Sequence, residues 1–119
     1  MPSPSYSDIK EAKILNNLYQ KHAESLGVIF PDFKNLPGPE KDFAGSTDMG
    51  NVSYIKPSIH PTYRIGNVVN HTKEFTAVAG LPAAQKPTLD SAKAMMMTAI
   101  EVLINSELLE KIKEEFEQT

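Results

Sequence analysis

Three histidines are the residues of this sequence best suited to bind a metal ion or carry a proton: His22, His60 and His71. His71 stands in a polar loop directly before an expected helix, and loops of this kind often hold site residues. His60 lies in an expected short strand, where a role in a site and a structural role are both open. His22 falls on the border between the apolar and polar faces of an expected helix, which favours a structural role.

The second candidate is the run Gly45-Ser46-Thr47-Asp48. A glycine lets backbone N–H groups approach a ligand, and the start of a following helix attracts a carboxylate. Equally, Ser, Thr and Asp before a helix act as caps, with Asp48 accepting backbone hydrogen bonds. From the motif alone, capping is the favoured interpretation. A triad of Ser46, His71 and Asp48 is disfavoured, because neighbours in one turn rarely converge.

The sequence contains no self-contained metal site. It has no His-Glu-x-x-His, no His-x-Asp pair and no carboxylates at the spacing of a calcium loop. It has no cysteine, which excludes disulfides and thiolate ligands. From residue type and position alone, a role of His71 outside a metal site is therefore the favoured interpretation, and a role as a ligand stays open.

Length and charge limit the other classes of function. A chain of 119 residues suits one domain. Its 12 basic and 15 acidic residues give a net charge of −3, which disfavours a nucleic-acid surface. No stretch matches a signal peptide or approaches the roughly 18 apolar residues of a membrane span. The sequence thus predicts a cytoplasmic protein with neither a nucleic acid nor a membrane as partner.

The expected elements make an α/β chain that is mostly helical, with one or two short strands. Asp8 and Glu11 match a capping box at the start of the first helix, and Gly27 matches the glycine that follows a helix end. Ser106 is the expected N-cap of the last helix. Helices are expected at about 8–26, 48–55, 73–79, 88–104 (with a start as early as Pro82) and from 106 onward, and short strands at 28–30 and 59–65.

The helix that ends at Ile104 is apolar on nearly all sides, in the sequence LDSAKAMMMTAIEVLI. Such a helix belongs inside a larger structure, so the sequence predicts an incomplete domain. The alternative is a helix between a sheet and a dimer partner, with its methionines filling irregular gaps. Both interpretations require additional protein surface.

Several segments follow one another in a recognisable order: GSTDMGNVSYIKPSIHP, a following strand that ends in IG, NHTKEF, FTAVAG, TLDSAKAMMMTAIEVLI and SELLEKIKEEF. This order resembles the C-terminal part of the catalytic domain in the zinc metallopeptidase family M-twenty. The likeness runs over roughly residues 6–116, and within the family it is nearest to the beta-alanyl-lysine type dipeptidases. The family also includes aminoacylases, carnosine-type dipeptidases and aminobenzoyl-glutamate hydrolases.

This resemblance implies that residues 1–119 are the C-terminal segment of a layered αβα hydrolase domain, without its lid domain. His71 would be the last protein ligand of a zinc pair, and Glu74 would help to orient it. The loop of Gly45, Ser46, Thr47 and Asp48 would contribute to the pocket for a small dipeptide or N-acyl amino acid. Metal-activated water would hydrolyse the amide bond.

The same resemblance implies that most of the active site is missing. The family's His-x-Asp element, bridging aspartate, paired glutamates and lid domain would all precede residue 1, so the chain is expected to be inactive alone. Its expected partners are the missing N-terminal portion or a full-length homologue, with a homodimer in the complete enzyme. Two alternatives stay open: a non-catalytic module that pairs with a full-length relative through the helix at 95–104, and a small unrelated α/β domain.

Overall fold

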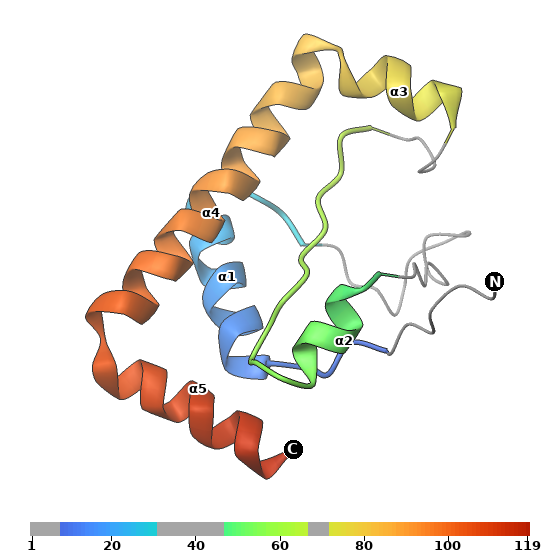
Figure 1. Ribbon diagram of the computed structural model, residues 1–119. Helices are drawn as coiled ribbons and strands as arrows, with labels where there is room; N and C mark the ends of the chain where they lie inside the picture. Colours follow the sequence, from blue (N-terminus) through green and yellow to red (C-terminus); the bar gives the residue numbers. More distant parts are fainter. Residues whose placement is uncertain (1–7, 31–46, 67–71) are drawn as a thin grey trace, which may run out of the picture.

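The structure is a computed structural model that describes residues 8–30, 47–66 and 72–119 (Figure 1). The described part is mostly helical, as the sequence predicts. It contains no strand, so the strands expected at 28–30 and 59–65 are not confirmed. Its helices are α1 (Lys13–Ser25), α2 (Met49–Ser53), α3 (Lys73–Ala79), a 3-10 turn (Pro82–Ala84), α4 (Gln85–Ile104) and α5 (Ser106–Gln118).

Helix α4 is the longest element, and the other helices lie along one side of it. In Figure 1, α1 crosses behind its middle while α3 and α5 turn back from its two ends. The core forms where α1 meets α4, from the buried side chains of Tyr19, Ala23 and Ala94. Two alanines at this contact let the helix axes approach closely. Leu26, Val28, Phe30 and Ile59 pack around this core and are partly buried.

The end of α1 confirms the glycine prediction. Gly27 has a φ of +90°, a backbone conformation that side chains other than glycine rarely adopt. Its N–H donates to the carbonyl of Glu24 at 3.0 Å, and the N–H of Val28 donates to the carbonyl of Ala23 at 3.1 Å. These paired bonds are a Schellman motif, and Val28 packs against the core beside Ala23.

The predicted start of α1 is wrong. The helix begins at Lys13 and has no side-chain cap, so the expected capping box is not formed. Asp8 instead accepts a hydrogen bond from the hydroxyl of Tyr54 at 2.9 Å. The N–H of Lys10 donates to Ser53 Oγ at 2.8 Å. Residues before α1 therefore contact the end of α2 in place of capping α1. These contacts join residues more than 40 positions apart, so a local capping pattern cannot predict them.

Two further boundaries differ from the sequence expectation. Helix α2 ends at Ser53, whose hydroxyl donates to the carbonyl of Gly50 at 2.5 Å. The N-cap of α5 is Asn105 and not Ser106: its side chain accepts from the N–H of Leu108 at 3.1 Å. Asn105 is extended and therefore suits the cap position, where it also separates α4 from α5. None of the described helices is long and apolar enough to span a bilayer.

Candidate functional site

The predicted site residues that can be located lie just before α2 and in the first turn of α3, outside the α1–α4 core. An extended segment, residues 57–66, joins the two helices (Figure 1). Gly45, Ser46 and His71 lie outside the described residues. Thr47, Asp48 and Glu74 are the candidates that the structure places.

Thr47 and Asp48 form the turn that leads into α2. The hydroxyl of Thr47 accepts a hydrogen bond from the N–H of Met49 at 3.3 Å. Asp48 occupies the N-cap position in a helical conformation, and its side chain makes no capping hydrogen bond. The capping interpretation is therefore wrong for Asp48, whose exposed carboxylate is not used to hold the turn.

Helix α3 has the bounds that the sequence predicts, and it begins directly after the candidate ligand position. Its N-cap is Thr72, whose hydroxyl accepts a hydrogen bond from the N–H of Phe75 at 3.1 Å. At the end of the extended segment, a Cβ added to Gly66 would meet Val78 Cγ1 at 2.9 Å. The backbone of Gly66 therefore lies against α3, so both residues that bracket positions 67–71 are in contact with this helix.

Glu74 lies in the first turn of α3, and it is exposed. A carboxylate in this position is favoured by the positive end of the helix dipole. Helix α3 contains no buried residue, although Phe75 and Val78 are partly buried. Its first turn thus presents a carboxylate on a helix that has little contact with the core.

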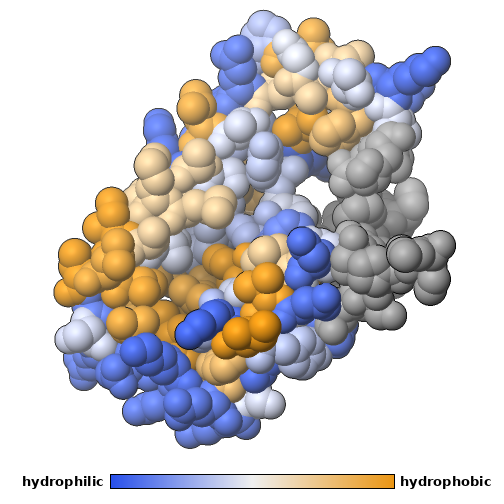
Figure 2. Space-filling model, viewed as in Figure 1, coloured by the Kyte–Doolittle hydropathy of each residue, from blue (hydrophilic) through white to orange (hydrophobic). Residues whose placement is uncertain are grey.

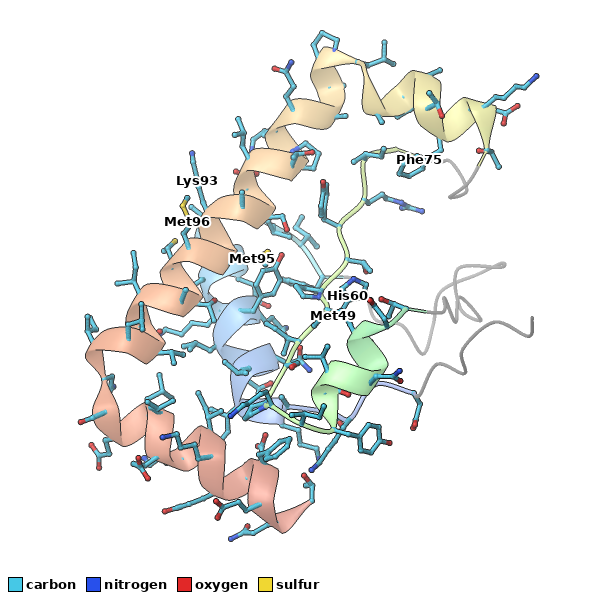
Figure 3. The ribbon with its side chains drawn as sticks, viewed as in Figure 1. Met49, His60, Phe75, Lys93, Met95 and Met96 are labelled. Carbon is cyan, nitrogen blue, oxygen red and sulfur yellow. The ribbon has the colours of Figure 1, made fainter. Side chains whose placement is uncertain are left out.

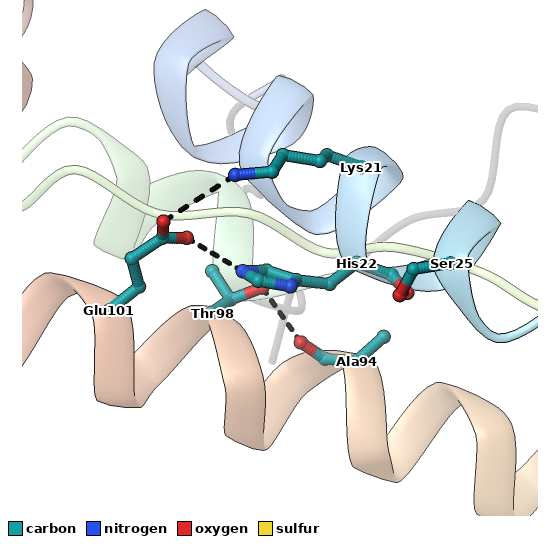
Figure 4. Close-up of polar contacts among 6 residues, drawn as sticks. All are labelled: Lys21, His22, Ser25, Ala94, Thr98 and Glu101. Atoms are coloured by element: carbon teal, nitrogen blue, oxygen red, sulfur yellow. Dashed lines mark hydrogen bonds and ion pairs between the residues drawn. The ribbon is translucent and has the colours of Figure 1, made fainter.

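The other histidines have different surroundings. His60 is exposed on the extended segment, and Figure 3 labels it in the same part of the view as Met49. His22 has the structural role expected of it: its Nε2 lies 2.6 Å from Oε2 of Glu101, which joins α1 to α4 (Figure 4). Lys21 Nζ lies 3.5 Å from the other oxygen of Glu101.

The His22 hydrogen bond holds the pKa of Glu101 below its usual value, against an opposing effect of burial and with help from the charge of Lys21. Sequence reasoning did not identify Glu101 as the partner of His22. The available signal was an acidic residue in the last turns of an otherwise apolar helix. A buried or half-buried charge in such a place needs a counter-charge.

The described residues do not by themselves fit a zinc pair. Across 8–30, 47–66 and 72–119, no group of three or more His, Cys, Asp or Glu side chains is placed to hold a metal ion. The described part does have a depression of about 340 Å³ between the end of α3 and the start of α4. It has no ionisable side chain in its lining, which consists of Ala79, Ala84, Gln85, Thr88 and Leu89.

Comparison with known proteins finds relatives along most of the chain, although no family model matches it. An Xaa-Arg dipeptidase of Homo sapiens is 43% identical over 113 residues, which are 93% of this chain and 25% of that protein. An Xaa-Arg dipeptidase of Mus musculus is 42% identical over 113 residues, with the same two shares. The chain therefore spans about a quarter of the length of these relatives.

Proposed function

The chain is homologous to Xaa-Arg dipeptidases, which are metallodipeptidases of the M-twenty family, and from this premise we propose that it contributes to the hydrolysis of small dipeptides. In this proposal residues 1–119 form the C-terminal segment of a layered αβα catalytic domain. The single observation that carries it is the identity of 43% over 113 residues with one enzyme of known reaction class. Similarity along nearly the whole chain cannot be attributed to one short motif.

The proposed role of His71 is to supply one ligand to a zinc pair, with the other ligands on protein that these 119 residues do not include. Thr72 supports this assignment, because its cap on the N–H of Phe75 fixes the backbone immediately after position 71. Glu74, two residues further on, would orient the ligand from the exposed first turn of α3. A zinc pair, when bound, supplies the Lewis acid for amide hydrolysis.

The proposed role of the Gly45–Asp48 run is to bind the substrate. Thr47 holds the turn through Met49, and the carboxylate of Asp48 is left exposed and not committed to capping. By analogy with the names of the relatives, the substrate would be a dipeptide with arginine as its second residue. The isolated chain is expected to be inactive, and the complete protein to be cytoplasmic and homodimeric.

A chimera tests this proposal. The 113 matching residues of the human Xaa-Arg dipeptidase would be replaced by those of this chain, and hydrolysis of an Xaa-Arg dipeptide would be measured. We expect the chimera to keep activity and bound zinc. Within it, His71→Ala should lower the zinc content and reduce activity by more than the roughly 10–100-fold that is typical of losing a residue that only orients a ligand.

The matched control is His60→Ala, which removes the exposed imidazole of the segment 57–66. This control should leave the zinc content unchanged. Equal loss of zinc in the two variants would overturn the assignment of His71. An inactive chimera with full zinc content would overturn the dipeptidase role of this segment while leaving the metal assignment intact.

The second candidate function is a non-catalytic module that pairs with a full-length relative. The observation that favours it is the apolar surface of α4, where Met95, Ile100 and Ile104 are each more than half exposed. Addition of the chain to a relative that lacks the matching segment separates the two candidates. Stable binding without recovered activity supports the module, and recovered activity supports the enzyme segment.

A further inference from the structure

Ser53 is a buried polar residue at the end of α2, with a side chain that is 1% exposed. Its hydroxyl makes two hydrogen bonds: it donates to the carbonyl of Gly50 at 2.5 Å and accepts the N–H of Lys10 at 2.8 Å. The first bond closes the last turn of α2. The second joins α2 to a residue that lies 43 positions earlier in the sequence. The buried hydroxyl is therefore used both as donor and as acceptor.

This contact belongs to a group of four residues that we name the α2 anchor: Asp8, Lys10, Ser53 and Tyr54. The hydroxyl of Tyr54 donates to Asp8 Oδ1 at 2.9 Å, and this hydrogen bond raises the pKa of the phenol. Lys10 also contacts the end of α5: its Nζ donates to the carbonyl of Phe116 at 3.0 Å and lies 4.0 Å from the centre of the Phe116 ring. The α2 anchor thus connects α2 to α5 through residues that precede α1.

Helix α2 depends on this anchor because little else holds it. It spans only Met49–Ser53, and a helix this short is unstable without tertiary contacts. Among the described helices, α2 has no packing contact comparable to that between α1 and α4. In Figure 2 it lies at the surface, where hydrophobic and hydrophilic side chains are mixed. Loss of the α2 anchor should therefore allow this helix to fray.

The first turn of α2 is built on the candidate substrate-binding run. The N–H of Gly50 donates to the carbonyl of Thr47 at 3.3 Å. The N–H of Asn51 donates to the carbonyl of Asp48 at 3.0 Å. Fraying of α2 would break these bonds, and it would move the exposed carboxylate of Asp48 together with its backbone.

We propose that Ser53 is a positioning residue for substrate binding, because it anchors α2 and thereby fixes the turn of Thr47 and Asp48. This proposal rests on the proposed function, in which the Gly45–Asp48 run binds the substrate. Ser53 is buried and lies at the other end of α2 from that run. It therefore acts through the helix and does not touch the substrate.

Steady-state kinetics tests this role in the chimera with the human Xaa-Arg dipeptidase, made so that it carries residues 8–119 of this chain. Ser53→Ala leaves the N–H of Lys10 without its acceptor. It should raise KM for an Xaa-Arg dipeptide about 10-fold and change kcat by less than about 2-fold, because the segment that moves binds the substrate. The matched control is Ser58→Ala, which removes a hydroxyl that donates to the carbonyl of Lys56 at 2.8 Å, and it should leave both constants unchanged.

Variants of the exposed pair separate positioning from a loss of folding. Tyr54→Phe and Asp8→Ala each remove the hydrogen bond of 2.9 Å, and each should raise KM about 3-fold. Asp8→Asn keeps an oxygen that accepts from Tyr54 and should keep the wild-type KM. Tyr63→Phe removes a hydroxyl from a similarly exposed tyrosine and is the control. Because these residues are exposed, their variants decide the question if Ser53→Ala does not fold.

Hydrogen exchange of the whole chain measures the α2 anchor without any activity. The amides of Asn51 and Val52 both donate to the carbonyl of Asp48, and Ser53→Ala should speed their exchange about 10-fold. The control for global stability is Tyr19→Phe, which removes a buried hydrogen bond from the α1–α4 interface. It should leave both the exchange of these amides and KM unchanged.

In an active chimera, an unchanged KM of Ser53→Ala would overturn the proposal, as would equal changes in Ser53→Ala and Ser58→Ala. Unchanged exchange of the α2 amides in Ser53→Ala would also overturn it, whether or not the chimera is active. A chimera that is inactive with the wild-type sequence of this chain is a different result. It would overturn the proposed function, and with it the substrate role of Ser53, while the exchange rates still show whether Ser53 anchors α2.

Discussion

The α1–α4 interface is built in the opposite way to the α3 edge, by which we mean helix α3 and the segment 57–66 that leads toward it. At the interface, Tyr19 and Ser91 share a buried hydrogen bond of 2.8 Å, and Ala23 and Ala94 are almost completely buried. At the edge, α3 has no buried residue, and the segment that joins α2 to α3 carries the exposed Tyr63. Of the candidate site residues that the structure describes, Glu74 belongs to this edge, whereas Thr47 and Asp48 precede α2.

Buried side chains and paired polar groups stabilise the α1–α4 interface through tertiary packing, whereas a helix with no buried residue gains little from such packing. Site residues on such an edge are positioned by local devices, such as the cap at Thr72, until another surface covers them. This difference between the two regions is consistent with a chain that supplies part of a site.

The largest effect is expected where the interface is tightest. Ala94→Leu inserts a branched side chain at a position that is 0% exposed, between α4 and the core residues of α1. Overpacking of this kind should reduce the free energy of unfolding by about 1–3 kcal/mol. The matched control is Ala77→Leu on α3, which is exposed and should change stability by less than about 0.5 kcal/mol. Urea unfolding would measure the free energy of unfolding of both variants. Equal losses in the two variants would contradict the difference in packing between the two regions.

A smaller effect is expected from the buried hydroxyl pair. Tyr19→Phe leaves the Ser91 hydroxyl without its partner at 2.8 Å and should cost about 1 kcal/mol. Tyr63→Phe, at an exposed residue of the edge, should be neutral. A double-mutant cycle with Ser91→Ala measures the coupling. Additive effects of Tyr19→Phe and Ser91→Ala would contradict the bond.

The pH dependence of the interface should be smaller, because Glu101 is partly exposed. Its pKa is lowered in the folded state, chiefly by the hydrogen bond from His22. The contribution of Glu101 to the free energy of unfolding is therefore fully present above its unfolded-state pKa, near 4.5. This contribution is lost as the pH falls through the lower pKa of the folded state. Glu101→Gln should flatten that part of the curve of unfolding free energy against pH. The same curve shape in the wild type and in Glu101→Gln would contradict a lowered pKa of Glu101 in the folded state.

The smallest global effect is expected at the edge. Thr72→Ala removes the cap of α3 and should destabilise that helix by about 1 kcal/mol. Because α3 has no buried residue, the loss should appear in hydrogen exchange of its amides and hardly at all in urea unfolding. Thr72→Asn keeps a capping side chain and is the control. A large change in the global transition would show that α3 is part of the core.

Local signals in the sequence predict some of these elements well. Gly27 ends α1, and α3 occupies the predicted residues, because a left-handed turn and a Thr cap are encoded within a few neighbours. The start of α1 could not be predicted in this way, since Asp8 contacts Tyr54, which lies 46 residues away. The segment at 59–65 has the composition of a strand, but a strand needs a neighbour to pair with, and the described residues provide none.

The candidate site shows the same limit. Residue types and the family resemblance were enough to single out His71, Glu74 and the Gly45–Asp48 run. The role of Asp48 as a cap was predicted from its type and is not formed, because its backbone is helical (φ −68°, ψ −12°) and a capping residue is normally extended. Convergence of ligands that are distant in the sequence cannot be derived from the local pattern of one segment, so the metal assignment stays a proposal.

The most direct test of the central claim is recovery of activity in trans. The chain would be mixed with a human Xaa-Arg dipeptidase that lacks the matching 113 residues, and hydrolysis of an Xaa-Arg dipeptide would be followed. The wild-type chain should restore hydrolysis, and the His71→Ala chain should bind equally well but restore none. Equal recovery by both chains, or tight binding of the wild type with no hydrolysis at all, would contradict it.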